Sequence, residues 1–499
     1  MNKVRSIPAL GAAVATIVAL CGAALWLAGC SVGPNYHRPD APTPTAWKAE
    51  GPWRRGDPRD QIPKGEWWKI FGDADLDALE SQGVSANFTV QASVAKLDQA
   101  RALARISTAA LFPQVGGGAS ADRTRISGNR PLSTPPFNLP VTQNNYQIPF
   151  SVSWEPDLFG RIRRSIAAAQ AAYQASGADL ENVRLATSSE LAGDYFSLRE
   201  LDAEIGVLNR TVQSFEKGMD LVQQRSKGGV ASGLDVAQEQ ALLDATRAQA
   251  ILLRQQRVQF EDAIATLTGQ PASNFKLAVK PMPATLPTIP VGMPSDLLER
   301  RPDVAGAERL MASANEQIGI AQAAYYPGVS LTGGAGLNST SLSNLASLPS
   351  AVWAVGAAIS ETLLTGGARR AQVEFAQAGY RVTIANYRGS VLTAFQEVED
   401  NLAGLAVLDE ASSAQAAAVT DSRKALDIAN NRYVGGLVSY LDVVTAQQTL
   451  LANERLAAQL EGQRLTTSVL LVKALGGGWD PASIAALHVD YPAKQALQP

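Results

Sequence analysis

The sequence has very few of the side chains on which most enzymes and structural metal sites depend. Among 499 residues there are only two His and two Cys. These numbers argue against a His/Cys zinc site, a Ser-His-Asp triad and a disulfide scaffold. The formal net charge is −3 and no run of basic residues occurs, so nucleic acid is not an expected partner. We therefore expect a protein that is not an enzyme and that needs neither a cofactor nor a metal.

Long apolar runs are also missing, apart from one stretch at the N-terminus. Lys3 and Arg5 precede an almost wholly apolar segment over residues 8–29. A basic start, an apolar centre and small residues before a cleavage site are typical of a secretory signal, although an uncleaved membrane anchor is the alternative. The closing Leu-Ala-Gly-Cys resembles the bacterial lipobox. This resemblance implies cleavage before Cys30 and lipid chains on Cys30, and Ser31 then favours the outer membrane.

The remainder of the chain contains an internal repeat. Residues 225–240 and 432–447 agree at eight of 16 positions, and Pro113 upstream corresponds to Pro327. A fixed order of matching positions indicates two copies of one structural unit. Between the copies lies a stretch over 271–294 with six Pro, which predicts a non-helical connector.

Each repeat is expected to contain the same elements in the same order. A helix leads to a pair of strands, a very long helix, a Gly-Gly turn and a return helix. Alternation of apolar and polar residues predicts the strands, and it fits either membrane-barrel strands or an ordinary hairpin with one hydrated face. The expected ranges are 84–110, 114–122, 147–154, 160–226 and 234–268 in the first repeat, and 296–325, 328–337, 351–360, 367–434 and 441–475 in the second.

The long helices carry apolar residues at heptad spacing. Between 198 and 222, and again between 391 and 405, apolar residues alternate at intervals of three and four, which is typical of a coiled coil. A helix of about 67 residues extends about 100 Å, and the return helix reaches only half as far. The helix expected at 84–110 can supply the missing length if it stacks end to end on the return helix at 234–268.

One chain therefore offers four strands, which is too few for a membrane barrel. A closed barrel needs at least about eight strands, because an open edge in lipid leaves backbone groups without hydrogen bonds. If the strands lie in a bilayer, several copies must combine them, and three copies would supply twelve. We expect an α+β membrane protein with a β-barrel in the outer membrane and a long α-helical duct beneath it.

Several blocks of sequence point to one known family. They are Gly33–Pro39, Trp67-Trp68, Leu298–Val304, Ile318–Ala321 and Leu475–Trp479. Together with the lipobox, these blocks resemble the outer-membrane factors of tripartite efflux pumps, the NodT-type, TolC-like lipoprotein family. The resemblance covers almost the whole mature chain. It implies a homotrimer with a twelve-stranded barrel and a periplasmic helical tunnel. It also implies two partners, a periplasmic adaptor (membrane fusion) protein and an inner-membrane pump of the RND type.

The sequence and the resemblance together favour a passive exit duct for small molecules such as drugs or toxic compounds. A duct for protein secretion and a non-conducting lipoprotein coiled-coil scaffold are the alternatives. The expected divisions are a cleaved signal peptide at 1–29, a lipidated extended segment at 30–72, repeat 1 at 73–270, a Pro-rich connector at 271–295, repeat 2 at 296–478 and a tail at 479–499.

The two helix turns contain the candidate functional residues. Asp235 and Asp442 begin the return helices, where an acid in the first turn stabilises a helix by about 0.3–1 kcal/mol. In a trimer they would also form a ring of six carboxylates at the closed tunnel end. Arg225 and Arg432 are near enough in sequence to latch that ring. The resemblance implies that the turns contact the adaptor. The contact residues would be Gly229, Val230, Ala231 and Ser232 in repeat 1, and Gly436, Leu437, Val438 and Ser439 in repeat 2.

Overall fold

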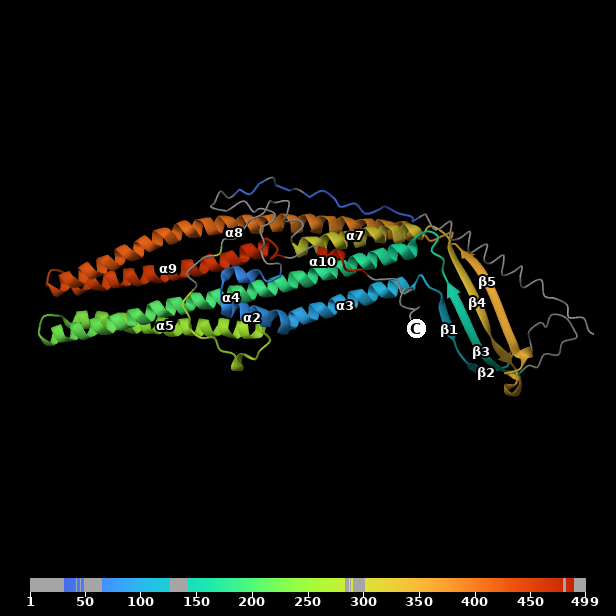
Figure 1. Cartoon of the computed structure of the whole chain (residues 1–499), viewed down its shortest axis with the longest axis horizontal. Coiled ribbons are helices and arrows are strands. Elements are labelled where there is room, and N and C mark those ends of the chain that lie inside the picture. The colour runs from blue at the N-terminus through green and yellow to red at the C-terminus, as the bar shows by residue number, and fades with distance from the viewer. Residues whose placement is uncertain are drawn as a thin grey trace, which may run out of the picture.

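The chain forms a long helical body with a sheet of strands at one end (Figure 1). The computed structural model describes residues 31–41, 43, 44, 46–48, 65–125, 142–282, 287, 289, 301–478 and 482–488. The predicted signal peptide, Cys30 and most of the predicted tail therefore lie outside the described residues. Within the described part, no helix combines the length and the apolar character needed to cross a membrane.

Two hairpins of long helices make up most of the body. Each pairs a 67-residue helix with a 35-residue return helix, as the repeat predicts. The four helices are α4 (Arg161–Lys227), α5 (Gly233–Leu267), α8 (Ala368–Val434) and α9 (Tyr440–Ala474). The apolar heptad positions face the interior, because Leu198, Leu208 and Phe215 of α4 are buried, as are Val391 and Val398 of α8.

The shorter helices differ in part from the prediction. The helix expected at 84–110 is two helices, α2 (Ala74–Ala86) and α3 (Phe88–Ala109), which meet at Asn87. The amide side chain of Asn87 accepts hydrogen bonds from the N–H groups of Thr89 and Val90 and so caps α3. The other short helices are η1 (Trp67–Phe71), η2 (Ala272–Asn274), α7 (Pro302–Ala323) and α10 (Ala482–Ala485).

The short helices stack on the return helices, as their lengths predict. Asn87 Nδ2 donates to the carbonyl of Leu267 in the last turn of α5 at 3.0 Å. In the second repeat Arg301, the N-cap residue of α7, donates to the carbonyl of Ala474 in α9 at 3.1 Å. Both joints supply a donor to a helix C-terminus, where carbonyl groups otherwise lack partners. Each long helix thus has a continuous neighbour made of two stacked helices.

We predict that Asn87→Ala lowers the free energy of unfolding by about 1–2 kcal/mol, because it removes the α3 cap and the bond to Leu267 together. Asn87→Asp keeps the cap and loses only the donor, so its loss should be smaller. The melting temperature of both variants in detergent tests this order. A larger loss in Asn87→Asp would contradict the dual role of Asn87.

The helices lie side by side in a single curved layer. Nearest the sheet the order of neighbouring helices is α3, α4, α7 and α8. Further from the sheet the order is α5, α4, α9 and α8. The largest apolar core lies where the short helices meet the long ones. It includes Trp67, Phe71, Tyr195 and Phe196, and the rings of Phe71 and Phe196 are 4.8 Å apart. Trp67 and Trp68 are therefore packing residues of this core.

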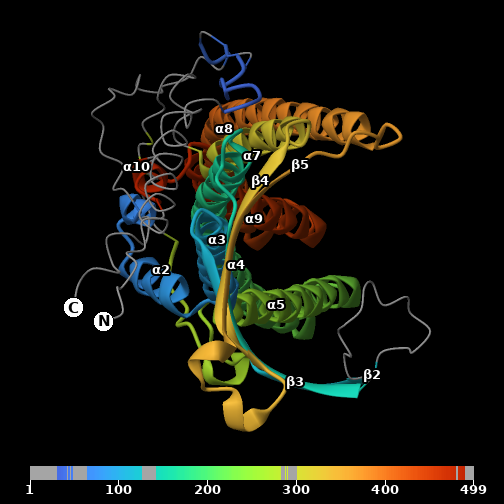
Figure 2. The same ribbon diagram turned by 90° about the vertical axis from the view of Figure 1, so that its right-hand side faces the viewer.

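The strands form one antiparallel sheet that follows an arc when seen end-on (Figure 2). Its strands are β1 (Gln114–Gly117), β2 (Ser120–Arg125), β3 (Thr142–Trp154), β4 (Gly328–Ser339) and β5 (Ala351–Ser360). The prediction of one strand at 114–122 is wrong, because β1 and β2 are separate and both pair with β3. The sheet is still four strands wide, in the order β1/β2, β3, β4, β5.

Candidate functional site

The register of the sheet places its large apolar side chains on one face. Directly opposed residues of antiparallel strands point to the same side. Phe150, Ala335 and Trp353 form one such row across β3, β4 and β5. The neighbouring rows on this face are Ile148–Leu337–Ala351, Val152–Gly333–Val355 and Trp154–Leu331–Ala357. A continuous apolar face is thus assembled from both repeats.

The opposite face carries small and polar side chains. Its rows are Pro149–Gly336–Val352, Ser151–Gly334–Ala354 and Ser153–Thr332–Gly356. The apolar face is exposed in the single chain, with Trp353 and Ile359 about three-quarters accessible. An apolar outer face and a small, polar inner face are the arrangement of a membrane barrel. An ordinary soluble hairpin buries its apolar face instead.

Aromatic side chains mark both ends of the apolar face. Tyr146 and Trp154 lie on this face of β3, eight residues apart. At about 3.3 Å per residue this separation is about 26 Å, close to the height of the apolar band of outer-membrane barrels. Beyond Tyr146 the face becomes polar, since Asn144 pairs with Arg123. Aromatic residues at both edges of an apolar band are typical of membrane interfaces.

The two hairpin tips have the same backbone geometry. In the first tip Gly229 has φ +72°, and the N–H of Val230 donates to the carbonyl of Arg225 at 2.8 Å. In the second tip Gly436 has φ +73°, and the N–H of Leu437 donates to the carbonyl of Arg432 at 2.9 Å. This is the Schellman arrangement, which requires a left-handed residue that glycine adopts without strain.

Asp235 and Asp442 each lie in the first turn of a return helix and bond to the serine that precedes the helix. Asp235 forms a capping box, because its carboxylate accepts from the N–H of Ser232 at 2.9 Å while its own N–H donates to the Ser232 hydroxyl. The hydroxyl group of Ser439 donates to the carboxylate of Asp442 at 2.7 Å. Both acids thus occupy the first turn, where a carboxylate stabilises a helix, and Asp235 alone completes a capping box. A second role at an aperture stays a prediction.

The two arginines near the tips have different surroundings. Arg225 lies over the ring of Tyr433, 4.7 Å from its centroid, and donates to the carbonyl of Val434 at 3.3 Å. Arg225 thus joins the first hairpin to the second within one chain. Arg432 is exposed, and its predicted role as a latch stays a prediction.

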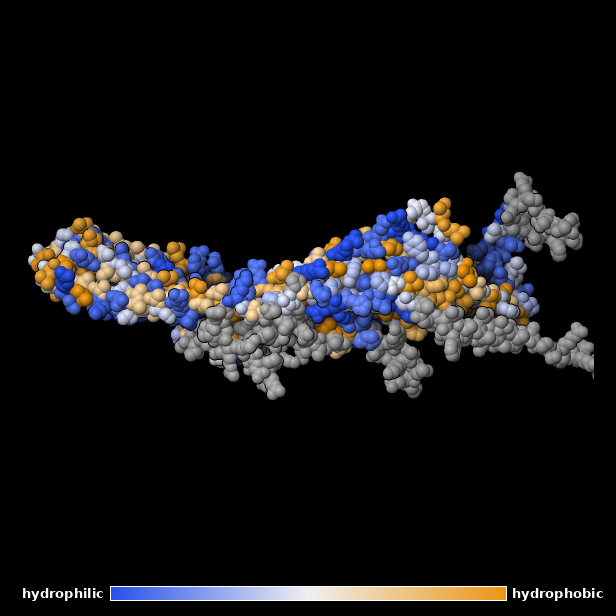
Figure 3. Space-filling view, turned by 90° about the horizontal axis from the view of Figure 1, so that it is seen from above, coloured by the Kyte–Doolittle hydropathy of each residue, from blue (hydrophilic) through white to orange (hydrophobic). Residues whose placement is uncertain are grey.

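Exposed apolar side chains gather at the tips, where Figure 3 shows hydrophobic surface at the end of the helical body. Val230 and Leu234 of the first tip are about two-thirds exposed. Their counterparts Leu437 and Leu441 in the second tip are exposed as well. Matched apolar residues at the free end of two hairpins form a surface that can bind another protein.

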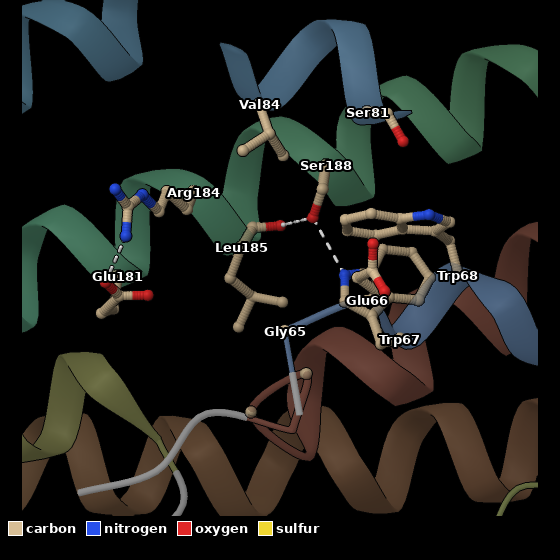
Figure 4. Close-up of a pocket in the computed structure, with 12 residues that line it drawn as sticks. Gly65, Glu66, Trp67, Trp68, Ser81, Val84, Glu181, Arg184, Leu185 and Ser188 are labelled. Carbon is tan, nitrogen blue, oxygen red and sulfur yellow. Dashed lines mark hydrogen bonds and ion pairs between the residues drawn. The ribbon is translucent and has the colours of Figure 1, made fainter. Parts of the chain in front are cut away.

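A pocket of about 490 Å³ lies beside the paired tryptophans (Figure 4). Trp67 Nε1 donates to the Ser188 hydroxyl at 2.9 Å, and Arg184 pairs with Glu181 at the rim. The pocket offers no nucleophile with an adjacent base. Across the described ranges, no three His, Cys, Asp or Glu side chains are grouped as a metal site would need.

The chain matches one protein family over most of its length. The family described as Outer membrane efflux protein matches residues 81–270 and 293–477. The solvent efflux pump outer membrane protein SrpC of Pseudomonas putida is 32% identical over 466 residues, which are 92% of this chain and 97% of SrpC. Outer membrane protein OprJ of Pseudomonas aeruginosa is 31% identical over 468 residues, or 93% of this chain and 96% of OprJ.

A solved structure has the same fold. The outer-membrane channel OprN superposes with a TM-score of 0.84 at 31% identity, covering 90% of this chain and all of OprN.

Proposed function

The chain belongs to the outer membrane efflux protein family, and we propose that three copies form its channel, with twelve strands in the outer membrane and a helical tunnel in the periplasm. Membership makes the protein the outer-membrane channel of an efflux system, a passive duct that catalyses no reaction. It replaces the alternatives of a protein-secretion duct and a non-conducting scaffold. The observation that carries the proposal is the sheet register, which gives one apolar and one polar face.

The internal repeat supports ring closure. Within one chain the first repeat meets the second through β3–β4 and α4–α7. At one free edge of the chain, β5 and α8 are the repeat-2 equivalents of β3 and α4. At the other free edge, β1/β2 and α3 are the repeat-1 equivalents of β4 and α7. A second copy can use these edges to repeat the contact already made inside the chain. Three chains with two repeats each then close a ring of six similar units.

One contact inside the chain predicts its counterpart between chains. Phe159 follows β3 and stacks on Tyr326, which lies between α7 and β4 in repeat 2. The two ring centroids are 4.8 Å apart. The corresponding segment after β5 contains Leu363 and Leu364, which are about nine-tenths exposed. The counterpart of Tyr326 is Phe112, which is also exposed. We expect Leu364 to approach Phe112 of a second copy.

The first described residues support the proposed lipid anchor. The N–H of Val32 donates to the carbonyl of Phe159 at 3.2 Å, at the junction of sheet and helices. The buried Arg164 donates to the carbonyls of Val32, Gly33 and Pro34. Ser31 itself lies against Gly160, at the start of α4 and close to the level where the apolar face ends. A lipid chain on Cys30 would enter the bilayer there, in agreement with the lipobox.

The tips provide the proposed contact with other parts of the pump. Efflux-pump membership implies partners, and we assign the adaptor contact to the residues from Gly229 to Ser232 and from Gly436 to Ser439. Their exposed Val230 and Leu437 fit an apolar partner surface. An RND-type inner-membrane pump then supplies energy and substrate. The printed name of the relative SrpC refers to solvent efflux, and we propose apolar organic compounds as cargo of the present chain.

Cross-linking and conductance together test the trimer. The mature chain has only the acylated Cys30, so a Leu364→Cys/Phe112→Cys variant introduces the only free thiols. We expect oxidation to give covalently linked trimers, whereas either single variant should stay monomeric in denaturing gels. The purified protein should also give single-channel currents in planar bilayers. Persistent monomers without currents would contradict the channel model.

A further inference from the structure

The seam between the two hairpins, close to the tips, contains a buried acid with no cationic partner. Glu239 of α5 is fully buried. Among the described residues neither of its carboxylate oxygens has a hydrogen-bond partner, and no Lys or Arg forms an ion pair with it. An ionised carboxylate in such a place costs several kcal/mol, so the group either finds a partner or becomes neutral.

Three helices of the two hairpins meet at this acid. Gly218 of α4 leaves the space that the carboxylate occupies, since a Cβ atom there would lie 2.6 Å from Glu239 Oε1 and 3.4 Å from the Tyr440 hydroxyl. Tyr440 belongs to α9, in the second hairpin, and is buried as well. Its hydroxyl and the side-chain carbonyl of Gln447 have no hydrogen-bond partner in the described part of the chain. Glu239 therefore sits where both hairpins must stay together.

The surroundings favour the neutral carboxyl group. Val222, Val443 and Val444 form an apolar cluster around Tyr440. Burial raises the pKa of the Glu239 carboxyl, and the nearby Tyr440 hydroxyl offsets part of that rise. Burial and the facing Glu239 also raise the pKa of the Tyr440 hydroxyl. The other described titratable groups around this seam include Tyr433, which packs on Tyr440, Arg225, which lies over Tyr433, and Asp235, which interacts electrostatically with Tyr433.

We propose that Glu239, seated on Gly218 and facing Tyr440, is a proton-binding site that holds the two hairpins together near the tunnel end. The site rests on the proposed function, because it assumes that the tips close the duct. With the proton bound, the neutral carboxyl group fits the dry seam. When α9 moves away from α4 and α5, water reaches Glu239, its O–H bond breaks and the proton passes to solvent.

Release of the Glu239 proton on opening determines whether a higher pH favours the open or the closed seam. The closed seam binds one proton more than the open seam at any pH between the two pKa values of Glu239. Raising the pH through that interval therefore favours opening, by up to about tenfold for each unit that separates the two pKa values.

Single-channel recording at pH 5.5 and 8.5 tests the site with three variants. The wild type should open at least about tenfold more often at pH 8.5. Glu239→Gln, a neutral mimic of the protonated acid, should stay closed at both pH values. Gly218→Ala displaces the carboxyl group and should open often at both. Asp244→Asn, which removes an exposed acid from the same helix, should behave like the wild type.

A pH step that persists unchanged in Glu239→Gln would overturn the proposal. Infrared difference spectra separate this failure from a failure of the channel itself. At pH 7 the wild type should show the C=O band of a protonated carboxyl group that Glu239→Gln lacks. If the band is present and no variant conducts, the proton site stands and the duct model is wrong. If the band is absent, Glu239 is ionised and the site is wrong whatever the currents.

Discussion

Replacement of Val355 by Arg is expected to prevent the protein from assembling in the outer membrane. Val355 lies on the apolar face of β5, one row from the centre of the band between Tyr146 and Trp154. An arginine near the middle of a bilayer costs about 2–4 kcal/mol per site in barrel proteins. In a trimer this penalty occurs three times, about 6–12 kcal/mol in all, which is comparable with the stability of a whole domain.

The adjacent residue provides a matched control for this substitution. Ala354 precedes Val355 on the same strand, and its side chain points to the face with Ser151 and Gly334. Ala354→Arg should insert normally and alter only the current, because its guanidinium would point into the aqueous lumen. The amounts of both variants in the outer-membrane fraction measure the difference. Equal amounts would contradict the assignment of the two faces.

The helical half of the fold was predictable because its signals are local. The predicted ranges of α4 and α8 agree with the structure to within one residue, and the Gly-Gly pairs located both turns. The break at Asn87 was missed, since the apolar pattern continues across it and only the cap marks the boundary. The stacking of α3 on α5 followed from length alone. The hydrogen bond from Asn87 to Leu267 connects α3 to α5, and its two residues are 180 positions apart in the sequence.

The strands were located by alternation, but alternation could not decide between a barrel and a soluble hairpin. That decision needs the register, which brings residues of both repeats into the same row, as with Phe150, Ala335 and Trp353. The gap between β1 and β2 was also invisible, because the Gly-rich stretch at 116–118 has few side chains to alternate. Pairing with β3 defines both strands in the structure.

Among the candidate site residues, too, only those whose contacts are close in sequence could be predicted. Asp235 was expected to stabilise its helix, and the capping box with Ser232 does so. The sequence does not mark Glu239 as a candidate site residue, since a single acid in a helix is usually exposed. Its burial depends on Gly218 and on Tyr440, which is more than 200 positions further along the chain. Neither residue belongs to a motif that could have pointed to the other.

The hydrogen bonds of Asp235 with Ser232 and of Asp442 with Ser439 determine how the proposed aperture must be tested. Six carboxylates in a narrow ring should make the current cation-selective. Alanine would remove the charge and these hydrogen bonds together, so a wider or unstable tip could be mistaken for a lost charge. Asparagine at both positions keeps a side-chain oxygen that can accept the hydrogen bond from each serine and removes only the charge.

We expect Asp235→Asn/Asp442→Asn to lose most of its preference for cations while conductance stays within about twofold of the wild type. Asp235→Ala/Asp442→Ala should lose the same preference and in addition fluctuate to larger currents, because each helix start loses about 0.5–2 kcal/mol. Reversal potentials in a salt gradient measure the preference. If the asparagine variant remains as cation-selective as the wild type, the two acids only stabilise their helices, and the narrowest ring of the duct lies elsewhere on the hairpins.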